Sequence, residues 1–350
     1  MLIEFSPTEL SALAIHKMGS KTEEEGVRIS RELFPLTDED LVLTLRNYFL
    51  DPFEPLEFFR FFHSADLALN EMFTYCGDIF EDPDSFLTQS IHIVQHLYEA
   101  SNHPNIKRGE ICVAYFDNII IEDEMVEAIG IFKSENKETF LRFDDDSFNL
   151  DVIEGISTKR MDKGCMIFNT EGEDGFRVLS VDRASGEAAQ FWLDQFLKVE
   201  RIQDGGFYTH SYLDLCRQFV KKVVAPQEDK KEQVEMLNKS IEYFSQKDNF
   251  DLEEFTEQVI EKEEYKETFM SFKQTYEEER DITPMEGFEI SAPEVKKMKR
   301  KFKNLIRLDT NIEIRLSSDD QNMGINRFVE RGFDEEKGMH FYKVYFHKEK

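Results

Sequence analysis

Apolar and polar residues alternate along much of the first half of the chain, as they do in strands that have two different faces. The alternating or half-apolar runs are 11–19, 26–34, 110–121, 125–135, 139–146, 162–172 and 176–183. Segments 36–53 and 85–105 look helical instead, with Thr37 as the expected N-cap of the first and Pro104 as the stop of the second. We therefore expect a mixed α/β N-terminal domain over residues 1–182, built on an antiparallel sheet.

From residue 183 the pattern becomes helical. Two sets of residues each share one helical face: Ala188, Phe191, Trp192, Phe196 and Val199, and then Tyr208, Tyr212, Leu215, Phe219 and Val223. Two or three more helices follow Pro226. Residues 228–281 hold 18 acids and 8 Lys or Arg, a formal charge of 8 − 18 = −10. We expect an acidic helical middle region over residues 183–281.

The remaining residues, 282–350, predict a C-terminal helix plus a β-hairpin. Segment 291–306 is a helix candidate, with Ser291 and Glu294 as a capping box. Its apolar stripe comprises Val295, Met298, Phe302, Leu305 and Ile306. A strand at 311–318 and a hairpin at 326–347, turning at 336–338, complete the region. The expected fold class is α+β.

Composition places the chain among globular proteins. Its 350 residues are 40% hydrophobic and include 33 Phe, enough for two or three domains with sizeable cores. The four cysteines, Cys76, Cys112, Cys165 and Cys216, stand far apart and form no CxxC pair, which favours a reduced cytoplasmic setting. We expect no membrane segment and no signal peptide, because the apolar runs are short and charged.

The formal net charge of −29 argues against a general nucleic-acid-binding surface, because binding DNA requires Lys or Arg against phosphates. Segment EVKKMKRKFK, residues 294–303, is the exception, with six Lys or Arg and one acid. The candidate DNA-contacting residues are Lys296, Lys297, Lys299, Arg300, Lys301 and Lys303, with Arg307 and Arg315 as possible extensions. The segment is either a phosphate-contacting face or a solvated helix face paired with the acidic middle region.

A second basic group consists of Arg217, Lys221 and Lys222. It either contacts phosphate or complements the dipole at the C-terminal end of its helix. His92 and His96 have a spacing that can seat a metal ion, but no third ligand is evident, and we expect neither a metal site nor a cofactor. No nucleophile motif is present, so we expect no catalytic residues and no enzyme.

The order of the segments from residue 176 to 222 resembles the bacterial nucleoid-associated protein family of the 37-kDa type. The resemblance includes a strand, a short turn and a helix of the type A-x-x-F-x-x-F-L, here Ala188, Phe191, Trp192, Phe196 and Leu197. Segments 149–169 and 288–316 are similar to the family's upstream strand and its C-terminal helix-then-strand element. One departure is the turn before Trp192, where this chain has only Arg183 and relatives often carry more basic residues.

The resemblance implies a non-catalytic cytoplasmic protein associated with the bacterial nucleoid, which binds double-stranded DNA with little sequence specificity. It supplies no catalytic residues. The alternative is an acidic protein–protein adaptor that binds basic or DNA-processing partners without touching DNA. DNA-associated proteins are possible partners in either case, and the sequence leaves open whether the chain forms oligomers.

Overall fold

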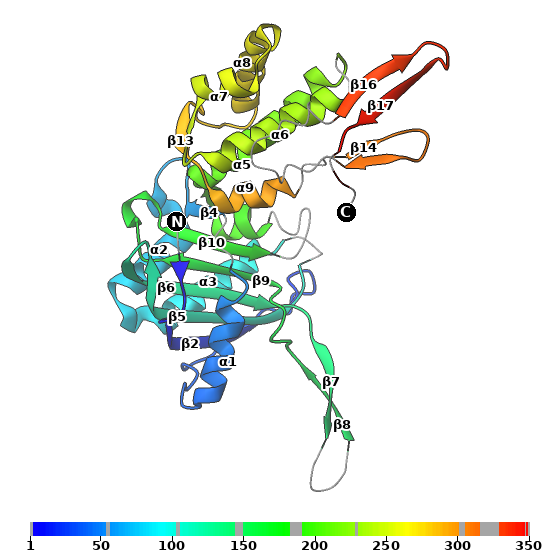
Figure 1. Ribbon diagram of the computed structural model, residues 1–350. Helices are drawn as coiled ribbons and strands as arrows, with labels where there is room; N and C mark the ends of the chain where they lie inside the picture. The colour runs from blue at the N-terminus through cyan, green and yellow to red at the C-terminus, as the bar shows by residue number, and fades with distance from the viewer. Residues whose placement is uncertain are drawn as a thin grey trace. The chain divides into compact units, whose positions relative to one another are not determined.

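The computed structural model describes residues 3–53, 57–102, 106–143, 150–182, 191–227, 230–300, 305–315, 329–346 and 348. The chain forms two compact units, Met1–Ile202 and Gln203–Lys350 (Figure 1). Helices, an antiparallel sheet and a C-terminal hairpin confirm the α+β class. The expected division into three parts stays a prediction, because compactness separates only these two units.

An antiparallel sheet forms the centre of the first unit. Its strands, in spatial order, are β11 Val199–Arg201, β4 Phe58–Phe61, β10 Arg177–Asp182, β9 Lys163–Phe168, β6 Glu124–Ser134, β5 Gly109–Ile121, β2 Glu9–Met18 and β3 Val27–Arg28. Strand β1, Ile3–Glu4, pairs with β5 as well. The expected strand at 26–34 is therefore only two residues long.

Both faces of this sheet are covered, so its central strands are apolar on both sides. Ile111, Val113 and Tyr115 of β5 pack with helices α2 (Glu71–Glu81) and α3 (Phe86–Ala100) and with the π-helical segment Phe191–Leu197. The intervening residues of β5 face α1 (Glu39–Leu50) on the other side. The N-cap of α1 is Asp38 and not Thr37, because the Asp38 carboxylate accepts the Leu41 N–H.

Strands β7 (Glu138–Phe143) and β8 (Leu150–Gly155) leave the sheet and form a separate two-stranded ribbon (Figure 1). Their neighbours in sequence, β6 and β9, pair directly with each other, with Lys133 opposite Lys163. The expected strand at 139–146 therefore exists, but it pairs with β8 and not with the main sheet.

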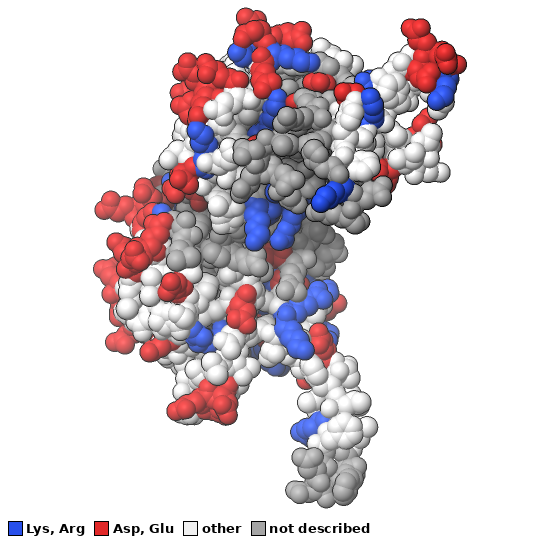
Figure 2. All heavy atoms as spheres, in the orientation of Figure 1, with Lys and Arg blue, Asp and Glu red and all other residues white. Residues whose placement is uncertain are grey.

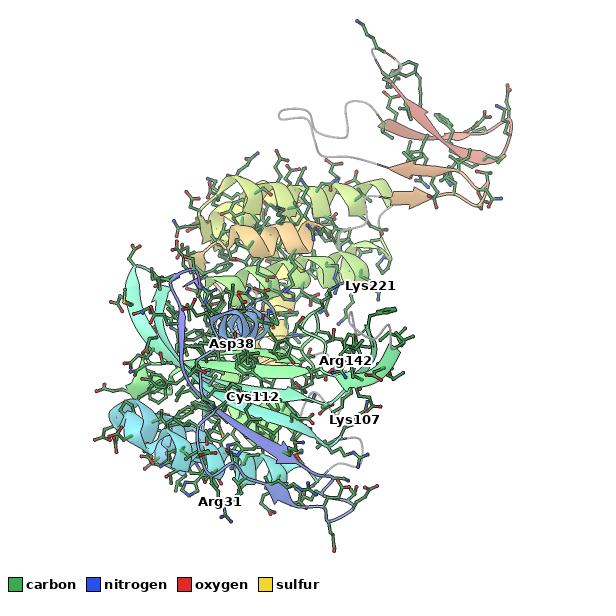
Figure 3. All side chains as sticks on the ribbon, turned by 90° about the horizontal axis from the view of Figure 1, so that it is seen from below. Arg31, Asp38, Lys107, Cys112, Arg142 and Lys221 are labelled. Atoms are coloured by element: carbon green, nitrogen blue, oxygen red, sulfur yellow. The ribbon has the colours of Figure 1, made fainter. Side chains whose placement is uncertain are left out.

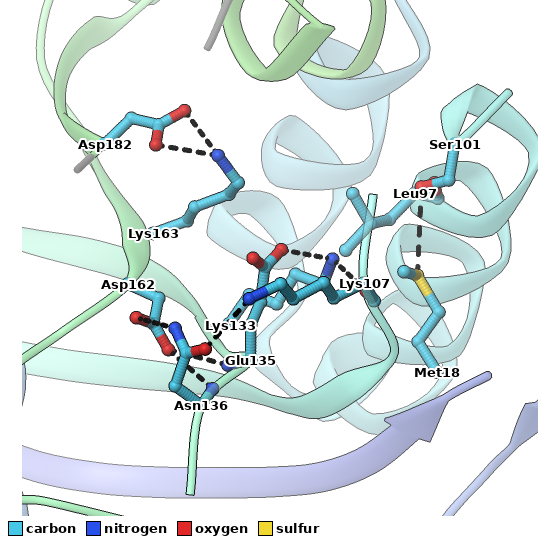
Figure 4. Close-up of polar contacts among 10 residues, drawn as sticks. All are labelled: Met18, Leu97, Ser101, Lys107, Lys133, Glu135, Asn136, Asp162, Lys163 and Asp182. Atoms are coloured by element: carbon cyan, nitrogen blue, oxygen red, sulfur yellow. Dashed lines mark hydrogen bonds and ion pairs between the residues drawn. The ribbon is translucent and has the colours of Figure 1, made fainter. Parts of the chain in front are cut away.

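Buried ion pairs lie at the ends of strands β6, β9 and β10, where this ribbon begins (Figure 4). The Lys133 ammonium, fully buried, donates to the Lys107 carbonyl at 2.7 Å and to Glu135 at 2.7 Å. Lys163 Nζ lies 2.6 Å from a carboxylate oxygen of Asp182. Burial lowers the pKa of the Lys133 ammonium, and Glu135 only partly offsets this effect.

The second unit is mainly helical. Its helices are α5 Gly205–Phe219, continued by a π-helical turn at Val220–Val224, then α6 Lys230–Gln246, α7 Leu252–Val259, α8 Glu263–Glu278 and α9 Ala292–Lys299. Three two-stranded ribbons accompany them: β12 Asn249–Asp251 with β13 Gly287–Glu289, β14 Leu305–Arg307 with β15 Glu313–Arg315, and β16 Val329–Asp334 with β17 Met339–Val344. The C-terminal hairpin, turning after Asp334, is confirmed.

Aromatic rings supply much of the core of this second unit. Tyr212 of α5 is fully buried, with its ring centroid 4.2 Å from that of Phe250 and 5.0 Å from that of Phe255. Rings of Phe244, Phe269 and Phe288 lie within the same cluster. Helix α5 is therefore the central helix, and its side chains are fixed by helices α6 to α9 around it.

Candidate nucleic-acid interface

Helix α9 holds most of the described part of the predicted basic face. It begins after Ser291 and packs against α5 and α6. Val295 and Met298 are buried in the core of the second unit, as the apolar stripe predicted. Lys296, Lys299 and Arg300 are exposed. The helix is thus held by a narrow apolar edge, and its remaining surface is cationic.

The predicted capping box does not form. Ser291 is the N-cap residue, but its side chain makes no capping hydrogen bond, and its N–H donates to Thr209 Oγ1 of α5 at 2.9 Å. Glu294 is fully buried and turns toward α5 instead of back to Ser291. A tertiary partner has replaced the local one, because a buried carboxylate requires hydrogen bonds wherever it lies.

Two basic side chains contact the Glu294 carboxylate. His210 Nδ1 lies 3.1 Å from its Oε2, and Lys297 Nζ lies 3.2 Å from its Oε1. Burial favours the neutral acid, but the hydrogen bonds from His210 and Lys297 outweigh burial and hold the pKa of the Glu294 carboxyl below its usual value. Lys297 is therefore engaged with the protein itself, unlike its exposed neighbours.

Helices α5 and α9 run side by side in the same direction. Near their N-terminal ends, a Cβ on Gly205 would lie 2.4 Å from the Glu289 carbonyl oxygen, so only glycine permits this close approach. One turn further along, His210 meets Glu294. The C-terminal ends of both helices, which carry their Lys and Arg residues, therefore lie at the same end of the pair.

The three exposed cations of α9 are available to a ligand. Among the residues that the structure describes, Lys296, Lys299 and Arg300 make no hydrogen bond or ion pair, whereas Lys297 is paired within its own helix. Within the described residues, the acidic helices α7 and α8 therefore do not neutralise these three cations. This arrangement leaves open the phosphate-contacting interpretation of the segment.

The expected helix at 291–306 is too long. It ends at Lys299, and Leu305–Arg307 forms strand β14, which pairs with β15. Lys301 and Lys303 lie outside the described residues. Arg307 and Arg315 lie on β14 and β15, and the described part of the structure does not extend to their side chains. Their backbone belongs to the β14–β15 ribbon, and their part in the basic face stays a prediction.

The second basic group lies on α5 and its π-helical turn. The Arg217 guanidinium donates to Asp214 Oδ1 at 2.6 Å, and Lys222 Nζ lies 5.7 Å from the centroid of the Phe272 ring. Lys221 is exposed and has no partner among the described residues (Figure 3). Within this group, Lys221 alone has a charge that is not already engaged in the described structure.

A cationic cluster in the first unit was not anticipated. Five exposed residues surround the root of the β7–β8 ribbon: Lys107, Arg108, Lys137, Lys159 and Arg160. Figure 2 shows Lys and Arg side chains gathered where this ribbon meets the sheet. A cavity of about 310 Å³ lies among them, lined by Lys107, Asn136, Glu138, Ser157, Arg160 and Asp162. These residues are scattered along the sequence as pairs and singles, so no run of basic residues marks them.

Acidic side chains pair with two members of this cationic cluster. Lys137 pairs with Glu110 at 2.9 Å, and Arg108 pairs with Glu25 at 3.3 Å. Both side chains remain well exposed, Arg108 at 73%, so these are surface pairs of small energy that can be exchanged for others.

The predicted histidine pair is occupied by protein contacts. His96 Nε2 lies 3.0 Å from the Phe196 carbonyl oxygen, and His92 Nδ1 lies 2.9 Å from Gln89 Oε1. Burial lowers the pKa of the His96 imidazole, which fits a neutral ring. Within the described ranges, no group of three or more His, Cys, Asp or Glu side chains is arranged to hold a metal ion.

Comparison with known proteins gives one family. The sequence profile of the family described as NA37, nucleoid-associated protein YejK, matches residues 14–337. No curated protein matches the chain. Within the described residues, no helix has the length and apolar character needed to cross a membrane.

Proposed function

Because the chain belongs to the NA37 family of nucleoid-associated proteins, we propose that it binds double-stranded DNA, without catalysing a reaction, through the exposed cations of α9. The family match covers residues 14–337 and therefore most of the chain. We place the protein at the bacterial nucleoid in the cytoplasm on the same basis. The observation that carries the proposed site is the exposed set Lys296, Lys299 and Arg300, which have no ion-pair partner among the described residues, in a chain of net charge −29.

The net negative charge of the protein limits the range over which the cations of α9 can attract DNA. The acidic remainder of the molecule repels DNA at long range, but salt screens this repulsion beyond about 8 Å under physiological conditions. Close contact then depends on the local cations, which release counterions from the phosphates. Lys221, near the same end of the helix pair, extends the surface.

Binding through α9 is expected to be largely independent of sequence. Lys side chains provide point charges, whereas reading a base edge requires bidentate donors such as Arg, Asn or Gln. Arg300 is the one described candidate of that kind among the exposed cations of α9. A competition experiment between duplexes of different sequence should therefore give similar affinities, and a strong preference would contradict this mode.

The direct test measures duplex affinity against salt for the native protein and for a variant with Lys296→Gln, Lys299→Gln and Arg300→Gln. The variant should bind more weakly, and its slope of log K against log salt should be flatter by about 0.9 for each phosphate that it no longer neutralises. A matched control carries Lys247→Gln, Lys266→Gln and Lys337→Gln, which removes the same charge from ion-paired lysines elsewhere. Equal reductions in affinity for both variants would contradict a site on α9.

A second candidate function is an acidic adaptor for basic protein partners. Helices α7 and α8 expose many carboxylates, and Figure 2 shows Asp and Glu side chains over this part of the second unit. Exposed acids on these helices are Glu253, Glu257, Glu263, Glu264, Glu267 and Glu278. If the native protein does not bind duplex DNA even at low salt, the adaptor function is favoured.

A further inference from the structure

The cavity at the root of the β7–β8 ribbon contains two cations that can bind an anion. Lys107 Nζ donates to a neutral partner, Asn136 Oδ1, at 3.0 Å, and no carboxylate pairs with this ammonium among the described residues. The Arg160 guanidinium lies 3.9 Å from Asp162, a long distance for an ion pair, and its side chain is 56% exposed. An ammonium and a guanidinium that line one cavity form a suitable site for an oxyanion.

The acid beside Arg160 is engaged with other donors. The Asp162 carboxylate accepts the backbone N–H groups of Glu135 and Asn136 and the Asn136 side-chain amide, at 2.7, 3.0 and 2.8 Å (Figure 4). Burial opposes ionisation of Asp162, but these donors outweigh it and lower the pKa of its carboxyl. Asp162 therefore holds the wall of the cavity in place, and its charge is shared among several donors.

The chemistry of the wall selects a phosphate group over a complete small molecule. Sites for small molecules are lined mainly by apolar and aromatic side chains. All six residues that line this cavity are polar or charged, and they include the hydroxyl of Ser157 and the amide of Asn136. A nucleoside base therefore finds no ring to stack on, whereas a phosphate finds cations and neutral hydrogen-bond donors.

Further cations continue the surface outside the cavity. Lys159 is exposed and has no partner within the described part of the chain. Arg108 and Lys137 are paired with Glu25 and Glu110 at the surface, and a phosphate can replace such partners at small cost. Several cations around one cavity fit a chain of phosphates, whose charges recur along a backbone, better than they fit a single anion.

We propose that the cationic cluster is a second surface that contacts the phosphodiester backbone of duplex DNA, on the unit that does not carry α9. Lys107 and Arg160 bind one phosphate in the cavity, and the cations outside it contact neighbouring phosphates. This inference rests on duplex binding, as proposed for the whole chain, but not on the α9 site. One chain then neutralises phosphates at two surfaces, and the salt dependence of binding exceeds what the three α9 cations account for.

Duplex affinity of a Lys107→Gln and Arg160→Gln double variant, measured against salt, tests the surface. We expect binding at 0.1 M salt to be weaker by roughly tenfold or more, and the slope of log K against log salt to be flatter by about 1.8. A matched control with Lys198→Gln and Arg60→Gln removes one Lys and one Arg of the same unit from ion pairs elsewhere. A double variant that binds no more weakly than this control overturns the proposal.

A gain of affinity provides a test that misfolding cannot imitate. Glu138 lines the cavity, is exposed and has no ion-pair partner among the described residues, so its charge opposes a bound phosphate. The Glu138→Gln variant should bind duplex DNA about threefold more tightly, as expected for removing one like charge about 6 Å away in water. The control, Glu173→Gln, removes an exposed acid of the same unit that does not line the cavity. Equal changes in the two variants would contradict a phosphate in this cavity.

The outcomes separate this surface from the α9 site. If only the variant with Lys296→Gln, Lys299→Gln and Arg300→Gln loses affinity, the proposed function stands and the second surface is overturned. If only the Lys107→Gln and Arg160→Gln variant loses affinity, the α9 site is refuted and the second surface is supported. If both are correct, the reductions in slope should add when the variants are combined.

Inorganic tripolyphosphate distinguishes a nucleic-acid backbone from a free phosphate ligand. Isothermal titration calorimetry compares the native protein with the Lys107→Gln and Arg160→Gln variant. A native protein that binds tripolyphosphate through these two residues but does not bind duplex DNA at low salt has a site for a free phosphate compound, which overturns the duplex assignment. Duplex binding that requires both residues supports it.

Discussion

His210 of α5 forms a hydrogen bond of 3.1 Å with the carboxylate of Glu294 of α9, which is fully buried. This contact sets the rotation of α9 about its own axis. With Glu294, Val295 and Met298 directed inward, Lys296, Lys299 and Arg300 are directed to solvent. The polar contact inside the unit therefore determines which cations can meet a ligand.

Replacing Glu294 with Gln should destabilise the second unit. The amide keeps the shape of the side chain but loses the charge-assisted hydrogen bonds with His210 and Lys297. We expect the free energy of unfolding to fall by about 1–3 kcal/mol at neutral pH, measured by urea denaturation. The Lys296→Gln variant is a suitable control, since that side chain is exposed and should change stability very little.

The effect of Glu294→Gln should depend on pH. The folded protein holds the pKa of this carboxyl below its ordinary value of 4.5, so ionised Glu294 stabilises the fold above pH 4.5, and this stabilisation is lost as the pH falls below it. The difference between native and variant should therefore be complete at neutral pH and should shrink in acid. A constant difference down to about pH 3 would contradict this account.

Lys221 and Arg217 should contribute unequally to duplex binding. Arg217 must give up its 2.6 Å hydrogen bond with Asp214 to reach a phosphate, whereas Lys221 has no such cost among the described interactions. We expect Lys221→Gln to weaken duplex affinity more than Arg217→Gln, with a salt slope lower by about 0.9. Filter binding at several salt concentrations measures both. Equal effects would indicate that Asp214 releases Arg217 readily.

The Lys163–Asp182 pair should be important for the first unit. Lys163 is 2% exposed and the Asp182 side chain is 9% exposed, with 2.6 Å between Nζ and a carboxylate oxygen. Lys163→Met removes the ammonium from a largely buried ion pair, and we expect a loss of roughly 3–5 kcal/mol in thermal or urea unfolding. The double variant with Asp182→Leu should recover most of that loss. A double variant as unstable as the single one would mean that the pair supplies an interaction that apolar packing cannot replace.

The four cysteines should be unreactive in the native protein. Burial raises the thiol pKa of all four, that of Cys112 and Cys216 to about 12, so few thiolates exist at pH 8. A chromogenic disulfide reagent should therefore react slowly before denaturation and with all four thiols after it. Rapid reaction of one native thiol would indicate local opening around it.

The local pattern of apolar residues was sufficient to predict a strand or helix where the buried face of that element is apolar along its length. Alternation predicted strands β5 and β6, and helical spacing predicted α5, because each shows its burial directly in its sequence. No expectation was formed for residues 58–81, where the structure has β4 and α2. Strand β4 has only four residues, and polar residues interrupt the apolar pattern of α2, so neither pattern is long enough to detect.

Tertiary contacts decided the cases that the sequence pattern missed. Leu305 and Ile306 continue a helical stripe from Val295, but pairing of β14 with β15 ends the helix at Lys299. The signature of Ser291 and Glu294 is local, whereas the partner that Glu294 takes, His210, lies 84 residues away. The DNA-contacting residues themselves stay predictions. Exposure of a Lys or Arg side chain allows contact with a phosphate but does not show that the contact forms.

The pairing of β6 with β9 has a consequence for how this protein can vary. Because Lys133 and Lys163 already lie side by side in the sheet, residues 135–162 form one long excursion that begins and ends at the same place. The entropic cost of closing such an excursion rises only slowly with its length. Insertions and deletions can therefore lengthen, shorten or replace the ribbon while the sheet beneath keeps its register.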